Sequence, residues 1–170
     1  MTSVIQNRDS TLELRRRPWV ASKAVSARSV SISRWTSANT LPCCLNLMHA
    51  FRTTGGVVSG DSLAMLLRGR SDQPLSLLAR WIVNRQVLCF ECHSQTLLPM
   101  FQFDLEGLTV RPGLRPVMTE LSDVFDDREL VDWFATPNCW LSGKSPVAVF
   151  SNDLAAVLRA ARADRFIATG

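Results

Sequence analysis

The 170-residue sequence contains no tyrosine and only two histidines, His49 and His93, so side chains that act as general acids and bases are scarce. No apolar run approaches the ~20 residues that a membrane-spanning helix needs, and no signal peptide is evident. Cys92 and His93 follow a predicted strand, and their adjacency alone does not make a nucleophile–base pair, because successive side chains of a strand point to opposite faces. We therefore expect a cytoplasmic protein that is not an enzyme and contacts no membrane.

Two short motifs indicate bound groups, and both are incomplete. Residues 89–93, Cys-Phe-Glu-Cys-His, match the attachment pattern of c-type haem, but they lie on or beside a predicted strand and no export signal is evident. A zinc site would need further ligands, and Cys139 is a single candidate. Residues 143–145, Gly-Lys-Ser, resemble the end of a phosphate-binding loop, but Asn138 occupies the position of its first glycine. We expect no cofactor and no metal.

Positive charge is concentrated in the first part of the chain. Residues 1–48 hold seven basic and two acidic residues, a net charge of +5, whereas residues 49–170 hold twelve and thirteen, a net charge of −1. The first segment is also rich in serine and has little periodicity. It fits an organellar transit peptide, a nucleic-acid-contacting arm, or a disordered leader before a natural start at Met48. We favour the leader, because the pattern changes at Met48.

Residues 49–110 are predicted to form a helix-turn-helix-like unit followed by a two-stranded β-hairpin. Ser59 caps the first predicted helix, which ends at Gly69, and Pro74 opens the second. The hairpin has strands over 86–91 and 96–101, joined by a turn of about four residues. Its second strand is expected at a sheet edge because it contains a proline.

The second helix of this unit carries polar side chains that suit nucleic acid. Arg80, Asn84 and Arg85 are expected to face outward and are the candidate DNA contacts, because such side chains bond phosphates and base edges. A polar face that is only solvated is the alternative. Leu75, Leu78, Ala79 and Ile82 are expected on the opposite, buried side.

Residues 111–170 are predicted to be a helical domain. A first helix over 116–125 is followed by a second with an acidic start at 126–127, which Pro137 ends at Thr136. A turn with Gly143 leads to a helix that begins at residues 145–146, and a last helix begins near Asp153. The expected fold class is therefore mainly α, with one hairpin.

The turn carries a resemblance to a known family. Residues 133–147, Trp-Phe-Ala-Thr-Pro-Asn-Cys-Trp-Leu-Ser-Gly-Lys-Ser-Pro-Val, and 157–161, Val-Leu-Arg-Ala-Ala, resemble the toxin-binding domain of the Xre/MbcA/ParS antitoxins. That family's pattern is a tryptophan-bearing helix, an Asn-x-x-Leu-x-Gly-x-x-Pro turn and a last helix. The match covers roughly residues 115–170. More weakly, residues 59–64 and 97–104 resemble the N-terminal half of small antitoxin-like bacterial proteins.

The resemblance implies a binding function. Related antitoxins lodge their C-terminal end in the active site of a toxin, often an NAD-degrading enzyme of the RES type, and repress their own operon. A protein toxin is thus the expected partner, DNA is a second one, and a homodimer is an option. The alternative is a stand-alone transcriptional regulator or structural adaptor with the same fold. The residues expected to contact the partner are Trp140, Leu141, Gly143, Pro146, Arg162, Arg165 and Phe166.

Overall fold

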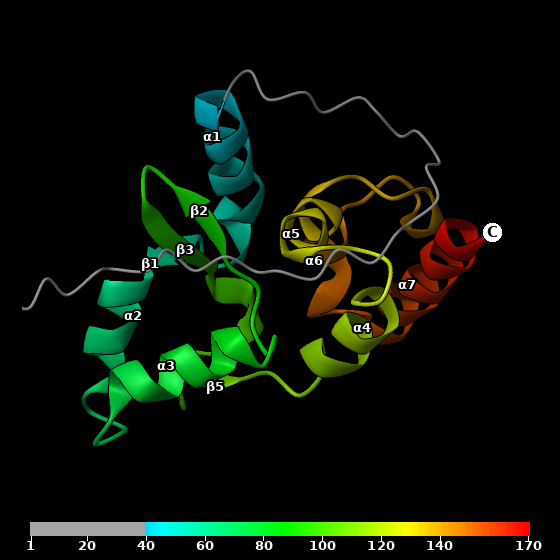
Figure 1. Ribbon diagram of the computed structural model, residues 1–170. Helices are drawn as coiled ribbons and strands as arrows, with labels where there is room; N and C mark the ends of the chain where they lie inside the picture. The colour runs from blue at the N-terminus through cyan, green and yellow to red at the C-terminus, as the bar shows by residue number, and fades with distance from the viewer. Residues whose placement is uncertain (1–39) are drawn as a thin grey trace, which may run out of the picture. The chain divides into compact units, whose positions relative to one another are not determined.

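The computed structural model describes residues 40–170, with side chains from Cys44 onward, and these residues belong to one compact unit. They are mainly helical, with two small antiparallel sheets (Figure 1). The α-helices are α1 (Thr40–Phe51), α2 (Gly60–Leu67), α3 (Pro74–Val83), α4 (Leu114–Leu121), α5 (Asp127–Ala135), α6 (Pro146–Phe150) and α7 (Leu154–Thr169). Short 3-10 turns are η1 (Arg52–Thr54), η2 (Met100–Gln102) and η3 (Cys139–Leu141). Within residues 40–170, no helix combines the length and apolar character that a membrane span requires.

The first helix begins earlier than the sequence pattern suggested. α1 starts at Thr40, so the boundary expected at residue 48 lies inside a helix. Cys44, Leu47 and Phe51 follow one another at helical spacing and are all buried in the main hydrophobic cluster. A chain that began at Met48 would therefore lack two of the core side chains of α1. The remainder of the expected leader, residues 1–39, lies outside the described residues.

Helices α2 and α3 begin where the capping residues predict. The Ser59 hydroxyl accepts a hydrogen bond from the Ser62 N–H at 3.2 Å, and Pro74 is the first residue of α3. The predicted stop at Gly69 differs, because α2 ends at Leu67 and Gly69 does not adopt a left-handed conformation. The predicted buried face of α3 is also partly wrong, since Leu78 is buried and Ile82 half-buried but Leu75 and Ala79 are exposed. Most positions of α3 are apolar, so the pattern did not fix which side faces the core.

The larger sheet has three strands, β1 (Val57–Ser59), β2 (Phe90–Cys92) and β3 (Gln95–Pro99), in the order β1-β3-β2. β3 is thus central, and the expectation that its proline marks an edge was wrong. Pro99 is tolerated because it is the last residue of the strand, opposite Val57. The hairpin turn has two residues instead of four, with φ of 50° at His93 and 62° at Ser94. Positive φ at both central residues is typical of tight hairpins.

The second sheet is a two-stranded ladder of β4 (Phe103–Asp104) and β5 (Thr109–Val110). Gln102, just before β4, is the only polar side chain buried among the described residues, with 0% exposure. Its Oε1 accepts from the Leu88 N–H at 2.7 Å, and its Nε2 donates to the Leu88 and Pro99 carbonyls, both at 2.9 Å. The Gln102 side chain therefore bonds the N–H and the carbonyl of Leu88 as a neighbouring strand would.

The start and the end of α5 follow local sequence signals, whereas α4 differs from its prediction. Asp126 and Glu129 form a reciprocal capping box at the start of α5, and Thr136 leaves the helical conformation just before Pro137. α4 occupies Leu114–Leu121, not the predicted 116–125. α7 packs against α4, α6 and η3, which gives the main cluster its C-terminal half (Figure 1).

Candidate partner-binding surface

One carboxylate on α7 joins this helix to two elements that lie 24 to 31 residues earlier in the sequence. Oδ2 of Asp164 accepts hydrogen bonds from Trp133 Nε1 at 2.7 Å and from Asn138 Nδ2 at 2.6 Å. Its Oδ1 accepts from Trp140 Nε1 at 3.0 Å. Since α5 contributes Trp133 and the η3 turn contributes the other two donors, Asp164 fixes both elements to the last helix. We call these four residues the Asp164 node.

Asn138 stabilises the η3 turn with hydrogen bonds to both its side chain and its main-chain carbonyl. The Asn138 side chain accepts from the Trp140 N–H at 2.8 Å, and its carbonyl accepts from the Leu141 and Gly143 N–H groups at 3.1 and 3.0 Å. Gly143 has a φ of 76°, in the left-handed region that glycine adopts without strain. The Asn and Gly of the family-like pattern therefore both have structural roles in this turn.

The predicted partner-contacting residues divide into buried and exposed groups. Leu141 and Pro146 are buried and anchor the turn to the core, so they are not surface residues. Trp140 and Phe166 are 54% and 77% exposed, and Ile167, which sequence reasoning missed, is 65% exposed. Ile167 lies seven residues after the buried Ala160, so it continues the buried face of α7 beyond the core, whereas Phe166 lies on the opposite side. We call Trp140, Phe166 and Ile167 the apolar end.

Two arginines of α7 are held beside this end. Glu120 of α4 accepts from Arg162 Nε at 2.9 Å and from Arg165 Nη1 at 2.8 Å. These two hydrogen bonds hold the pKa of the Glu120 carboxyl below its ordinary value. Arg162 and Arg165 are thus on the surface, as expected, but each already has a partner within the chain.

The Glu120 pair predicts a specific acid dependence of stability. Because its folded-state pKa is lowered, Glu120 stabilises the protein above its ordinary pKa and loses that contribution as the pH falls below that ordinary pKa and through the folded-state pKa. Glu120→Gln should therefore lose less stability than wild type as the pH falls. Glu106→Gln alters an exposed side chain and should lose as much as wild type. Thermal melts from pH 7 to 3 measure the difference. Parallel acid curves for wild type and Glu120→Gln would contradict the assignment.

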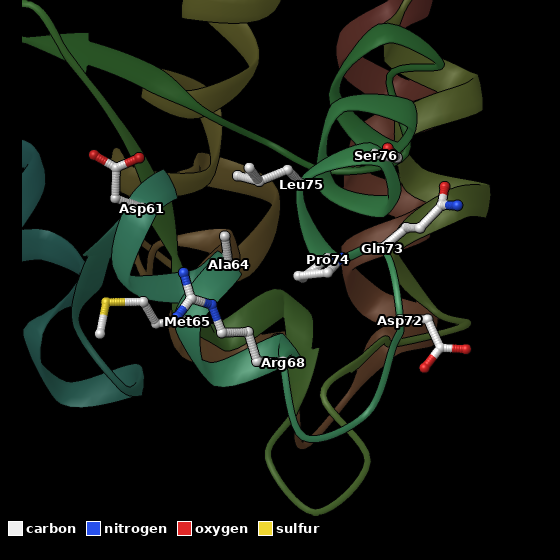
Figure 2. A pocket seen from close by; sticks show the side chains of 9 residues that line it. All are labelled: Asp61, Ala64, Met65, Arg68, Asp72, Gln73, Pro74, Leu75 and Ser76. Atoms are coloured by element: carbon white, nitrogen blue, oxygen red, sulfur yellow. The ribbon is translucent and has the colours of Figure 1, made fainter.

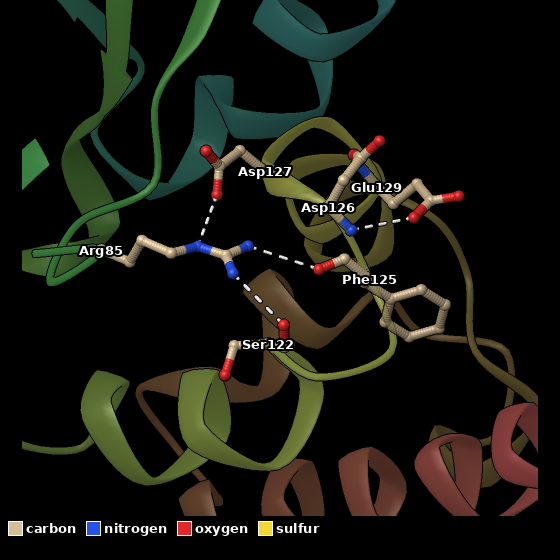
Figure 3. A network of polar contacts seen from close by, with 6 residues as sticks. All are labelled: Arg85, Ser122, Phe125, Asp126, Asp127 and Glu129. Atoms are coloured by element: carbon tan, nitrogen blue, oxygen red, sulfur yellow. Dashed lines mark hydrogen bonds and ion pairs between the residues drawn. The ribbon is translucent and has the colours of Figure 1, made fainter. Parts of the chain in front are cut away.

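The candidate DNA contacts differ in exposure and in their partners within the chain. Arg80 and Asn84 are exposed, as expected. Arg85 is half-buried, and its guanidinium is engaged by groups of the same chain (Figure 3). Its Nε bonds Asp127 at 2.7 Å, and its two terminal nitrogens donate to the carbonyls of Ser122 and Phe125 at 3.2 and 3.3 Å.

The position of Arg85 has a local cause. The residue has a φ of 51°, so the chain turns just after α3 and directs the guanidinium toward the connection between α4 and α5. That connection offers carbonyls that the end of α4 leaves without helical partners. Arg85 is therefore a structural link, which the sequence pattern could not distinguish from a nucleic-acid contact.

The cysteine–histidine motif shows a contact that strand geometry did not predict. His93 lies in the hairpin turn, so its Nδ1 approaches the Cys92 Sγ to 3.3 Å. The Cys92 thiol is buried. Burial, and then the charges of Asp127 and Glu91, raise the pKa of the nearby Cys89 thiol, which keeps that sulfur protonated. Among the described residues no cluster of three or more His, Cys, Asp or Glu side chains is arranged to hold a metal ion.

A shallow pocket of ≈ 520 Å³ lies between α2 and α3 (Figure 2). Asp61 of α2 lines it, with Arg68 and Asp72 of the connection and apolar side chains such as Met65 and Leu75. Because its charged groups are of both signs, the pocket has no clear preference for a charged ligand.

No protein-family model, curated protein or solved structure matches this chain. The functional conclusion therefore depends on the geometry and the sequence pattern alone.

Proposed function

We propose that the chain is an antitoxin-like binding protein that places its apolar end in a cavity of a partner toxin. The observation that carries the proposal is the exposure of Phe166 and Ile167 near the end of α7 and of Trp140 in the η3 turn, which the Asp164 node ties to α7. Contiguous exposed apolar surface marks interaction sites, and Phe166 and Ile167 are consecutive residues that are both exposed. The resemblance to the Xre/MbcA/ParS toxin-binding domain supplies the class of partner, with an RES-type enzyme as the first candidate.

Burial of the apolar end in a partner cavity would contribute favourable free energy to binding. Burying the exposed Phe166 and Ile167 side chains would contribute about 1.5–3 kcal/mol each. The entropic cost of binding is reduced because the η3 turn and α7 are already ordered by hydrogen bonds. Arg162 and Arg165, fixed by Glu120, would form a charged rim that orients an acidic partner surface.

We also propose that residues 49–110 form a helix-turn-helix-like unit with a hairpin, and that this unit supports the toxin-binding end. We do not extend the proposal to DNA, because Arg85 is engaged within the chain and residues 49–170 carry a net charge of −1. A stand-alone DNA-binding regulator is the alternative function. A salt-dependent gel shift with purified protein, lost in Arg80→Ala, would favour that alternative.

The proposal predicts that one charge at the apolar end abolishes partner binding without unfolding the protein. Phe166→Glu and Ile167→Glu alter exposed side chains, so stability should change by no more than about 0.5 kcal/mol. The matched control is Leu105→Glu, which alters a side chain with 63% exposure outside the apolar end. On co-expression with the toxin, the control should still protect cells and the other two should not.

The partner for this test can be identified with a photo-crosslinking amino acid at position 166. The proposal predicts one strong crosslinked protein from position 166 and none from position 105. Equal crosslinking from both positions would contradict it. Deleting residues 160–170 is a poorer test, because it removes the buried Ala160 and Ala161 together with Asp164 and would disturb the core.

A further inference from the structure

A second hollow lies on a different part of the chain from the apolar end. It has a volume of ≈ 590 Å³ and is bounded by the end of α3 and its following turn, by β5, and by the start and middle of α4. Arg85, Arg111 and Arg115 line it, and no carboxylate of the described residues does. The volume is within the range of small-molecule sites, about 300–1,000 Å³. We call this hollow the arginine groove.

Two of its arginines have positive charges that no acidic residue in the described part of the chain neutralises. Arg111 is half-buried, and its Nε and Nη1 donate to uncharged acceptors, the Phe103 carbonyl at 3.1 Å and the Ser151 hydroxyl at 2.9 Å. Arg115 is exposed and makes no ion pair within residues 44–170. By contrast, Asp127 compensates Arg85. A guanidinium held in place by neutral groups keeps its remaining N–H donors and its charge for an anion.

The rest of the groove suits a flat, partly polar group. Trp81 is half-buried and tilted against Phe103, with ring centroids 5.9 Å apart, so its position is fixed by the core. Met118 adds apolar surface, while Asn84 and Gln86 bring side-chain amides. Amides pair with the edges of heterocyclic bases, and aromatic rings contact their faces.

We propose that the arginine groove binds a nucleotide, with its phosphates on Arg111 and Arg115 and its base beside Trp81. The guanidinium groups would bind the phosphates through bidentate contacts, and the Trp81 ring and the side-chain amides of Asn84 and Gln86 would contact the base. A single nucleotide fits better than a DNA duplex, because the groove is concave and residues 49–170 carry a net charge of −1. This site is independent of the apolar end, so either proposal can fail without the other.

Isothermal titration of the full chain with ADP, adenosine and inorganic phosphate tests the proposal. ADP should bind, and adenosine and phosphate should each bind at least about tenfold more weakly, because each lacks half of the contacts. Arg115→Ala should weaken ADP binding by about tenfold or more. Arg115 is exposed and its side chain bonds no other group within residues 44–170, so this variant should keep the wild-type melting temperature.

The matched control is Arg159→Ala, which removes an exposed arginine of α7 outside the groove. It should leave ADP affinity unchanged. The basic segment 1–48 is present in every variant, so any non-specific attraction of phosphate to it cancels from the comparison. Absence of ADP binding at millimolar concentration would overturn the proposal. So would equal losses in Arg115→Ala and Arg159→Ala, phosphate binding as tight as ADP, or tighter binding of a DNA duplex that Arg115→Ala weakens.

Discussion

Replacing Gln102 by leucine is expected to lower the free energy of unfolding by about 3–5 kcal/mol, although the two side chains have similar volumes. The wild-type side chain is fully buried and satisfies the Leu88 N–H, the Leu88 carbonyl and the Pro99 carbonyl. Leucine would leave all three backbone groups without partners, and each unsatisfied buried group costs about 1–3 kcal/mol. Urea unfolding followed by circular dichroism measures the change.

The control for Gln102 is Gln95→Leu, on an exposed side chain of β3. That substitution should change stability by no more than about 0.5 kcal/mol. Gln102→Glu should be as damaging as leucine, because a carboxylate would replace the amide donor that faces two carbonyl oxygens. A loss below about 1 kcal/mol in Gln102→Leu would show that the backbone near residue 88 finds other partners, and would contradict the role assigned to Gln102.

Replacing Asp164 by alanine is expected to cost about 2–4 kcal/mol and to release the η3 turn. The carboxylate accepts three hydrogen bonds, two from tryptophan side chains, and no other described group takes its place. Because Trp133 and Trp140 both lose a partner, tryptophan fluorescence should shift along with stability. Chemical unfolding and emission spectra of the same samples measure both effects.

The variant Asp123→Ala provides the comparison for Asp164. Asp123 is exposed, and its carboxylate accepts no hydrogen bond from the described residues, so its loss should leave stability and emission unchanged. The stability of Asp164→Asn should lie between those of Asp164→Ala and Asp123→Ala. An amide keeps one acceptor oxygen but presents hydrogens to a neighbouring donor. Equal stability of Asp164→Ala and Asp123→Ala would mean that the node does not hold the last helix in place.

Local signals in the sequence predicted local structure well. The cap at Ser59, the acidic start of α5 at residues 126–127, and the end of α5 before Pro137 all depend on residues within four positions of one another. Such signals act through short-range hydrogen bonds and backbone sterics, so they are visible in one sequence. The predicted mainly helical class with small antiparallel strands followed from them.

The features that sequence reasoning missed depend on contacts between distant residues. Gln102 reads as a polar residue between two phenylalanines, and only the fold places it against residue 88. Arg85 reads as an exposed basic residue until the chain brings it to Asp127. The strand β1 has three residues, too few for a clear alternating pattern, so the central place of β3 could not be foreseen.

In the candidate site, too, the local features could be predicted from the sequence and the contacts between distant residues could not. The sequence indicated Trp140 and Phe166 because the Asn-x-x-Leu-x-Gly-x-x-Pro pattern and the last helix are local features. It could not indicate that Asp164 joins the turn to α5, because those donors are 24 to 31 residues away. Nor could it separate buried Leu141 from exposed Trp140, since their burial is decided by packing against α7.

The most direct test of the central claim is the dissociation constant of the crosslinked partner, purified and titrated with wild type, Ile167→Glu and Leu105→Glu. We expect Ile167→Glu to weaken binding at least about a hundredfold, because a charge would be buried where an apolar side chain was accepted. Leu105→Glu should bind like wild type. Equal affinity of all three proteins would show that the apolar end of α7 is not the surface that the partner binds.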